Sequence, residues 1–252
     1  MPIRSKMHSN GVRVVTMDYP PVNALPVAGW FAVSEALNEA GADADTRVVV
    51  LRAEGRGFNA GVDIKEMQAT EGFTAILGAN RGCYEAFRSI YECPVPVVAA
   101  VNGFCLGGGV GLAGSADTII ASEDAYFGVP EVDRGALGAA THLSRLVPAH
   151  LLRTLYYTSR TISAARLAEL GSVAEVVPAD RLDDAAFAFA DEVAAKDPRV
   201  IRAAKEALNG IDPVDVVKSY RFEQGFTFEL NLAGVADDLR DDFVATGASS
   251  AP

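Results

Sequence analysis

The stretch "GFCLGGGVGLAG" at residues 103–114 is the part of the chain from which the fold can be read, because it places three glycines in a row at 107–109. It continues the apolar run "VPVVAAV" (95–101). A glycine inside a helix or strand costs about 0.5–1 kcal/mol relative to alanine. A run of glycines therefore indicates a place where the bare backbone is needed.

Four interpretations of the glycine run differ in what would use the backbone. Glycines can let a helix approach its neighbour closely. Gly109, Gly111 and Gly114 satisfy the dinucleotide pattern G-x-G-x-x-G, although several residues separate them from the strand that the pattern should follow directly. A phosphate loop would need a Gly-Lys-Ser/Thr sequence, which does not follow. The fourth interpretation is an oxyanion hole, in which amides at a helix N-terminus bind a negatively charged oxygen.

An oxyanion hole usually needs a second amide from another loop. The segment "GRGFNAGVDIKEM" (55–67) offers one, because a glycine-rich turn there follows the apolar run "RVVVLRA" (47–53) and opens a possible helix. Losing one such donor typically costs about 2.7–4 kcal/mol of transition-state stabilisation. Two backbone segments are thus expected to meet at one site.

Short β-branched runs alternate with amphipathic segments, which predicts an α/β fold. Strands are predicted at 11–17, 47–53, 95–101, 118–122 and 173–177, and helices at 27–41 and 76–93. From about residue 140 helical segments dominate. They are predicted at 164–171, behind the capping residue Ser163, and at 180–196, 199–209 and 213–230. This C-terminal third is expected to pack on the core or on a neighbouring subunit.

Composition and charge narrow the class of protein. The chain has 252 residues, half of them hydrophobic, and a formal net charge of −11. We expect no nucleic-acid partner and no membrane partner, because both carry negative charge. Three cysteines without C-x-x-C spacing suggest free thiols, and no segment resembles a secretory signal or a membrane span. The expected location is the cytoplasm, and no metal site is predicted.

Three blocks of the sequence resemble the signatures of the crotonase (enoyl-CoA hydratase/isomerase) superfamily. They are "FNAGVDIKEM" (58–67), "PVVAAVNGFCLGGGVGLAGSAD" (96–117) and "FGVPEV" (127–132), in the order and at the spacing of that family. With "PPVNAL" (20–25) and "AAKEALN" (203–209), the resemblance covers nearly the whole chain.

The resemblance implies a crotonase (ClpP-like) fold, a ββα spiral core with a C-terminal helical region. We expect the core at residues 1–195 and the helical region, which would serve oligomerisation and pocket closure, at 196–252. It also implies a homotrimer or homohexamer, and an acyl-CoA thioester as the substrate. No cofactor is expected, since coenzyme A is part of that substrate.

Site residues carry over position by position. The oxyanion amides fall on Val62 and Gly108. The remaining residues expected to bind substrate or coenzyme A are Val22, Asn23, Ala24, Ala60, Gly61, Asp63, Ile64, Gly107, Gly111, Pro130 and Arg134.

The catalytic positions depart from the pattern of the family's hydratases. Those enzymes use two glutamates to hold one water, and this chain keeps only the second, Glu131, while Gly111 stands at the first. The loop after Glu131 adds Asp133 and His142 as catalytic candidates. We assign the base to Glu131 or His142, with Asp133 orienting or assisting. Each of the two could instead be structural, His142 as a core histidine and Asp133 in a solvated ion pair.

The full-length pattern is similar to one branch of the superfamily, whose members hydrolyse a ring carbon–carbon bond of a bicyclic, cholesterol-derived CoA thioester. That chemistry is a vinylogous retro-Claisen cleavage, and Gly111 would then make room for a fused ring. The alternative is an enoyl-CoA isomerase or hydratase with a single catalytic glutamate. A third possibility is a CoA-ligand-binding protein without catalysis.

Overall fold

The computed structural model describes residues 2–8 and 10–246. Its larger sheet has the strand order β1-β2-β3-β5-β7-β10. These strands are β1 (Ile3–Met7), β2 (Val12–Met17), β3 (Val48–Ala53), β5 (Val97–Val101), β7 (Thr118–Ser122) and β10 (Glu175–Val177). Only β1 pairs antiparallel with its neighbour among these described strands; the other pairings are parallel. The central strands are buried on both faces, which is why their β-branched runs are continuous.

A second, smaller sheet has the order β4-β6-β8-β9. Its strands are β4 (Gly57–Asn59), β6 (Phe104–Leu106), β8 (Tyr126–Gly128) and β9 (Ile162–Ser163). After β3, β5 and β7 the chain passes directly into β4, β6 and β8, and each of these pairs is followed by helical segments. This repeated ββα unit confirms the predicted spiral fold.

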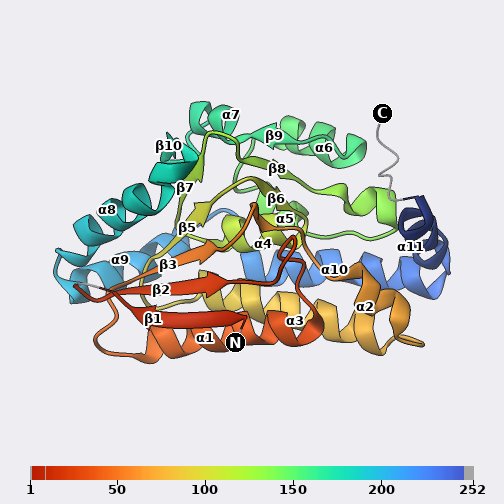
Figure 1. Cartoon of the computed structure of the whole chain (residues 1–252), viewed down its shortest axis with the longest axis horizontal. Coiled ribbons are helices and arrows are strands. Elements are labelled where there is room, and N and C mark those ends of the chain that lie inside the picture. The colour runs from red at the N-terminus through yellow and green to blue at the C-terminus, as the bar shows by residue number, and fades with distance from the viewer. Residues whose placement is uncertain (1, 9, 247–252) are drawn as a thin grey trace.

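Helices cover both faces of the larger sheet (Figure 1). On one face lie α1 (Val27–Ala42) and α3 (Thr74–Tyr91), which pack against each other. On the other lies α8 (Leu182–Ala194), whose alanines pack on β3, β5 and β7 in a second hydrophobic cluster. The other helical segments that precede α8 in the chain are α2 (Ile64–Ala69), α4 (Gly108–Ser115), η1 (Pro130–Arg134), α5 (Ala140–Leu143), α6 (Ala149–Thr158), α7 (Ala164–Glu169) and η2 (Ala179–Arg181).

The C-terminal helices are α9 (Pro198–Ile211), α10 (Val216–Leu232) and α11 (Val235–Thr246). Within the chain, α10 packs on α3 and α5, while α11 packs on α2 and η1. The C-terminal helices therefore fold back over the core of their own chain. The division at residues 195 and 196 stays a prediction, and residues 247–252 of the second region lie outside the described residues.

Most of the longer predicted elements are confirmed, including the helix that begins after Ser163, whose hydroxyl accepts a hydrogen bond from the Arg166 amide. The pattern did not predict β1, which has five residues. Nor did it predict the strands of the smaller sheet, because two or three residues show no periodicity. It also did not predict α6 and α11.

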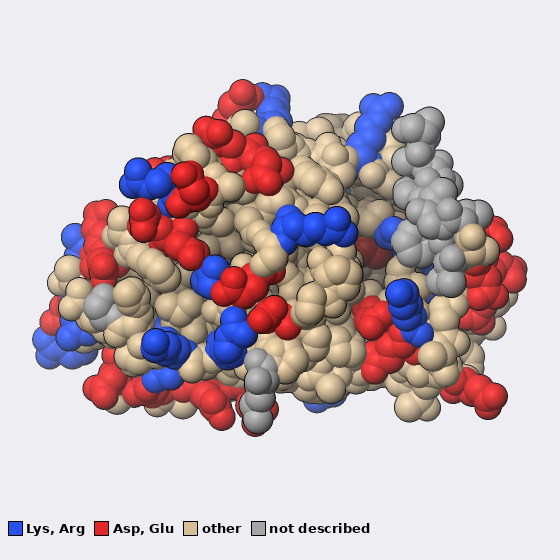
Figure 2. Space-filling view, viewed as in Figure 1, with Lys and Arg blue, Asp and Glu red and all other residues tan. Residues whose placement is uncertain are grey.

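No helix within the described ranges is both long and apolar enough to span a membrane. On the face shown in Figure 2, acidic and basic side chains are interspersed, without a continuous basic surface.

Candidate active site

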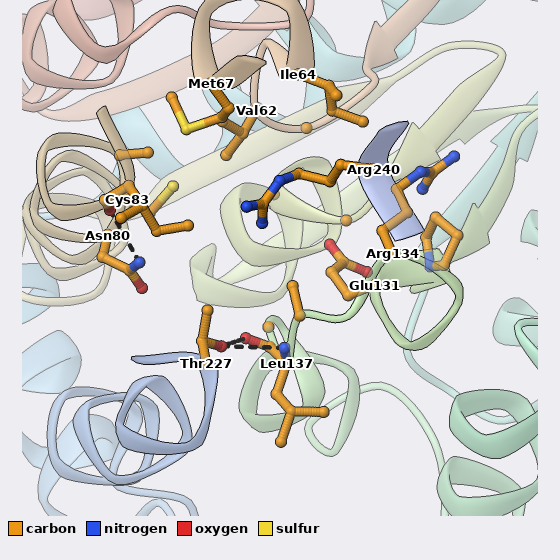
Figure 3. Close-up of a pocket in the computed structure, with 18 of the residues that line it drawn as sticks. Val62, Ile64, Met67, Asn80, Cys83, Glu131, Arg134, Leu137, Thr227 and Arg240 are labelled. Carbon is orange, nitrogen blue, oxygen red and sulfur yellow. Dashed lines mark hydrogen bonds between the residues drawn. The ribbon is translucent and has the colours of Figure 1, made fainter. Parts of the chain in front are cut away.

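A cavity of about 140 Å³ lies where the glycine-rich loops, η1 and the C-terminal helices meet (Figure 3). The expected residues that line it are Ala60, Gly61, Val62, Ile64, Gly107, Gly108, Pro130, Glu131 and Arg134. The others come mainly from helices and the loop after η1: Met67, Ile76, Ala79, Asn80, Cys83, Phe87, Ala136, Leu137, Gly138, Tyr220, Thr227 and Arg240. Two segments that are 46 residues apart at Val62 and Gly108 thus reach one cavity, as the glycine pattern predicted.

Helix α4 begins at the cavity wall without a side-chain cap. Its N-cap residue Gly107 has φ +55, and a Cβ added there would collide with Oε1 of Glu131. A Cβ at Gly108 would lie 2.5 Å from the Trp30 ring. Gly107 therefore has to be glycine because of both its positive φ and the lack of space for a Cβ. Gly108 has to be glycine because of the lack of space alone.

The Val62 loop is held by hydrogen bonds on both sides of Val62. The Gly61 amide donates to Oδ1 of Asn59 at 2.8 Å, and the Asp63 amide donates to the Leu25 carbonyl at 2.9 Å. Leu25 in turn donates to the Gly61 carbonyl at 2.9 Å. These bonds fix the loop while leaving the Val62 amide out of the network.

Neither the Val62 amide nor the Gly108 amide donates a hydrogen bond to another group in the described part of the chain. The two loops are in close contact, since a Cβ added at Gly61 would lie 3.4 Å from the Gly108 nitrogen. The amide of Gly108 also belongs to the first turn of α4, where the partial positive charge of the helix lies. Two unpaired donors from separate loops suit an oxygen that acquires negative charge.

The carboxyl group of Glu131 lies against Gly107 and Gly138, beside the start of α4. Its Oε2 is enclosed and has no hydrogen-bond partner among the described residues. Burial raises the pKa of Glu131 to about 8; a hydrogen bond from its own backbone and the Arg134 charge oppose this rise, and Glu223 adds to it. A carboxyl group with this pKa can accept or donate a proton near neutral pH.

The structure does not bring His142 to the cavity. Its ring is completely buried and packs edge-on against Phe87 and Tyr220, with ring centroids 4.5 and 5.0 Å apart. Neither ring nitrogen has a hydrogen-bond partner among the described residues, and burial, with a smaller effect of Arg145, lowers the pKa of His142 to about 3. In this geometry His142 is a neutral core side chain that packs behind Phe87 and Tyr220, which line the cavity.

The expectation that Gly111 leaves room for a substrate ring requires correction. Gly111 is buried in α4 and does not line the cavity within the described part of the chain. A Cβ added there would collide with the ring of Phe87, so that ring fills the space beside the glycine. Phe87 itself faces the cavity. The cavity wall at this position is therefore the Phe87 ring. Gly111 affects the cavity only indirectly, by leaving room for that ring.

The remaining predicted residues lie at varying distances from the cavity. Asp63 caps α2, accepting a hydrogen bond from the Lys65 amide at 2.9 Å. Asn23 is a buried structural residue, whose side chain accepts from the Tyr19 amide and donates to the carbonyls of Glu54 and Gly57. Val22, Ala24 and Asp133 are partly buried. Among the described residues these five positions do not line the cavity, and their roles in substrate or coenzyme binding or in catalysis stay predictions.

Sequence reasoning missed the wall that the helices supply. Cys83 and Phe87 from α3 line the cavity, as do Tyr220 and Thr227 from α10 and Arg240 from α11. Helical periodicity marks such residues as buried, but it does not tell a core contact from a cavity contact. The Thr227 hydroxyl donates to the Leu137 carbonyl at 2.5 Å and accepts from the Leu137 amide at 3.0 Å, which ties α10 to the loop after η1 (Figure 3).

Comparison with known proteins identifies close relatives. The sequence model of the enoyl-CoA hydratase/isomerase family matches residues 7–225. The chain is 65% identical over 247 residues to a Rhodococcus jostii protein named (7aS)-7a-methyl-1,5-dioxo-2,3,5,6,7,7a-hexahydro-1H-indene-carboxyl-CoA hydrolase, covering 98% of this chain and 96% of the relative. It is 67% identical over 244 residues to a Mycobacterium tuberculosis protein of the same name, covering 97% and 99%.

The fold comparison agrees. A crystal structure of an enoyl-CoA hydratase/isomerase from Xanthobacter autotrophicus superposes with a TM-score of 0.83 at 30% identity, covering 91% of this chain and 87% of that one. With the ββα spiral, the two glycine-rich loops at one cavity and the family match over residues 7–225, the chain belongs to the enoyl-CoA hydratase/isomerase family, the crotonase superfamily.

Proposed function

We propose that this chain is a hydrolase that opens the five-membered ring of a bicyclic, cholesterol-derived CoA thioester, the 7a-methyl-1,5-dioxo-hexahydroindene-carboxyl-CoA of its relatives' name. The observation that carries the proposal is the identity of 65–67% to two hydrolases of this name over nearly the whole chain. The cavity supports it with one carboxyl group, two unpaired amides and a largely apolar wall.

The reaction adds water to the ketone of the five-membered ring. Glu131 takes a proton from the water as the hydroxide forms a bond to the ketone carbon. The alkoxide then re-forms its double bond while the ring carbon–carbon bond breaks. The electron pair passes through the conjugated enone to the thioester oxygen, and the ring carbon is finally protonated. Water and substrate together account for every atom of the ring-opened acid, so the step needs no redox cofactor, and the proposed mechanism assigns no role to a metal.

Val62 and Gly108 are the proposed donors to the thioester oxygen as it becomes an enolate. Amides are suited to this task because they are fixed by the loop before the reaction begins, so no reorganisation is needed in the transition state. Glu131 is the proposed base, since it alone among the described lining residues carries a carboxyl group. It is also the group that can return the proton to carbon.

The test is direct. Purified protein incubated with the bicyclic thioester, without added cofactor, is expected to yield a product heavier by one water, with a new carboxylic acid and an intact thioester. Mass spectrometry and loss of the ring ketone signal would detect it. Turnover of straight-chain enoyl-CoA substrates alone would overturn the hydrolase assignment and favour the alternative, an isomerase or hydratase that uses Glu131 alone.

The proposed assembly is a homotrimer or homohexamer in the cytoplasm. Large apolar side chains are exposed on α9 and α10, including Ile211, Phe222 and Leu232 at 76%, 74% and 71%, which supports contact with another subunit. The three cysteines are buried and unpaired, as in a reducing compartment. Light scattering coupled to size-exclusion chromatography would distinguish a monomer of 26.5 kDa from threefold and sixfold assemblies.

A further inference from the structure

Arg240 is a cavity residue that the sequence pattern did not predict. It comes from α11, the last described helix, and its side chain is only 12% exposed. In Figure 3 its guanidinium points into the middle of the cavity. Its ion-pair partner is Asp237, one turn earlier in the helix, whose side chain is 69% exposed and lies outside the cavity lining. The cation therefore faces inward while its counter-ion faces water.

The cavity offers few groups that can meet a charge. Of its described lining residues, only Glu131 carries a carboxyl group and only Arg134 and Arg240 carry a guanidinium, and most of the others are apolar. An unpaired anion in such a place is costly. A guanidinium is the group best matched to a carboxylate, because its planar fork can donate two parallel hydrogen bonds.

The proposed reaction creates such an anion. It converts a neutral ketone into an alkoxide, whose negative charge passes to the thioester oxygen as the ring carbon–carbon bond breaks. The new carboxylic acid then loses its proton and becomes a carboxylate. The amides of Val62 and Gly108 are assigned to the thioester oxygen. The oxygen on the carbon that the water attacks needs another hydrogen-bond donor.

Arg240 is a better candidate than Arg134 for binding the oxygen on the carbon that the water attacks. Arg134 lies three residues from Glu131 on the same 3₁₀ turn, and its charge lowers the pKa of Glu131. Arg240 reaches the cavity from a different element, and the charges identified as acting on Glu131 are those of Arg134 and Glu223. Arg134 can thus act on the base, Glu131, while Arg240 binds the product.

We infer that Arg240 binds the alkoxide formed by water addition and then the new carboxylate of the ring-opened product. This inference rests on the proposed function. It makes Arg240 a catalytic residue, since it touches the reacting oxygen. It also makes the enzyme discriminate between a ketone and a carboxylate at the same end of the ligand.

The experiment compares the affinity of substrate and product. Dissociation constants for the bicyclic thioester and for the ring-opened acid are measured calorimetrically in the Glu131→Gln background, where turnover is suppressed, with and without Arg240→Met. We expect Arg240→Met to weaken binding of the acid by about 10- to 100-fold, the usual range for a hydrogen bond to a charged group, and binding of the ketone by less than about threefold. In the otherwise wild-type chain, Arg240→Met should lower kcat by about 100-fold.

Two further variants separate charge from structure. Arg240→Lys should recover part of the affinity for the acid, because a cation remains in place. Arg181→Met is the matched control: Arg181 also pairs with an acid three residues away, Asp184, but it is 65% exposed and outside the cavity lining. It should change neither affinity.

The outcomes are distinct. Equal weakening of both ligands by Arg240→Met, or no weakening of either, would overturn the role of Arg240 even if the wild-type protein opens the ring. If the wild-type protein does not open the ring of the bicyclic thioester, the proposed function fails and this inference fails with it. Unequal weakening with rescue by lysine supports it.

Discussion

A single carboxyl group, that of Glu131, lies in the described cavity lining, and it is the proposed acid–base group. Its environment decides how it can act. Burial holds the proton on the carboxyl until the pH approaches 8, whereas an exposed glutamate loses it near pH 4.5. The same burial makes the ionised form a stronger base, which is what removal of a proton from water requires.

The proposed role of Glu131 predicts a pH dependence. Since the base must be ionised and its pKa is raised to about 8, kcat/KM for the bicyclic thioester should rise with pH and level off above about pH 8. Glu131→Gln should lower kcat by about 100- to 10,000-fold and remove this rise. Initial rates between pH 6 and 9.5 would check it, and a kcat/KM that stays constant over this range would contradict the raised pKa.

Gly111 and Phe87 form a pair of complementary size. Because the Phe87 ring fills the space beside Gly111, we expect Gly111→Ala to destabilise the fold by about 1–3 kcal/mol through overpacking. The matched control is Gly225→Ala, an exposed position inside α10 with nothing within 4 Å of an added Cβ. That change should stabilise the helix by up to about 1 kcal/mol.

Urea unfolding of Gly111→Ala, Phe87→Ala and the double variant would measure the coupling between the two positions. The double variant should lose less stability than the sum of the single losses, because the added methyl enters space that the missing ring leaves. Simple additivity would show that the two residues do not share that space.

At the scale of elements, the site depends on how two loops are aimed. Gly107 precedes α4 with a positive φ, and Asn59 at the end of β4 holds the Val62 loop by accepting a hydrogen bond from the Gly61 amide. Asn59 is completely buried; it accepts from the Gly61 amide and donates to the Asn23 carbonyl at 2.5 Å. The side chain thus connects the 19–25 loop, the end of β4 and the Val62 loop.

Asn59→Ala should therefore cost both stability and activity. Two buried backbone groups would lose their partners, at about 1–3 kcal/mol each, and the Val62 amide would no longer be held in place. We expect kcat to fall at least tenfold. Asn209→Ala, which removes the hydrogen bond to the Tyr91 carbonyl outside the cavity lining, should lower stability and leave kcat unchanged. Parallel kinetics and thermal unfolding of both variants would test this; equal kcat values would argue against a positioning role.

At the scale of the whole molecule, α10 and α11 line one side of the cavity, and α9 connects them to the core. One anchor is the pair between Lys205 in α9 and Asp117, which follows α4. The Lys205 amine donates to both carboxylate oxygens at 2.8 and 2.6 Å and is only 4% exposed. Asp117 also accepts from the Val97 amide at the start of β5, so the pair joins α9 to the larger sheet.

Lys205→Met should destabilise the protein by about 3 kcal/mol, because it leaves a partly buried carboxylate without its cation. The control on the same helix is Arg199→Met, whose ion pair with Asp197 is exposed and should contribute less than about 1 kcal/mol. Chemical denaturation would compare them. A loss of similar size in both variants would show that the buried pair is not an anchor.

The predictable part of the molecule is the part governed by local pattern. The β-branched runs of β3 and β5 and the amphipathic α1 and α3 follow from periodicity, since each buries a continuous stripe or face. The glycine-rich loops could also be read, because a bare backbone at a helix start has few uses. The family resemblance then placed Val62, Gly108 and Glu131 at one site.

What the sequence by itself determined is therefore an α/β fold and two glycine-rich loops, to which the family resemblance added the spiral and the glutamate that lies beside the loops. What only the tertiary structure decided is the rest of the cavity: that Phe87 fills the space beside Gly111, that His142 is buried behind it, and that α11 brings Arg240 to the same cavity as Glu131. The physical reason is that these outcomes depend on which side chain occupies a shared volume. Such competition for space arises between segments far apart in the chain, where no local pattern records it.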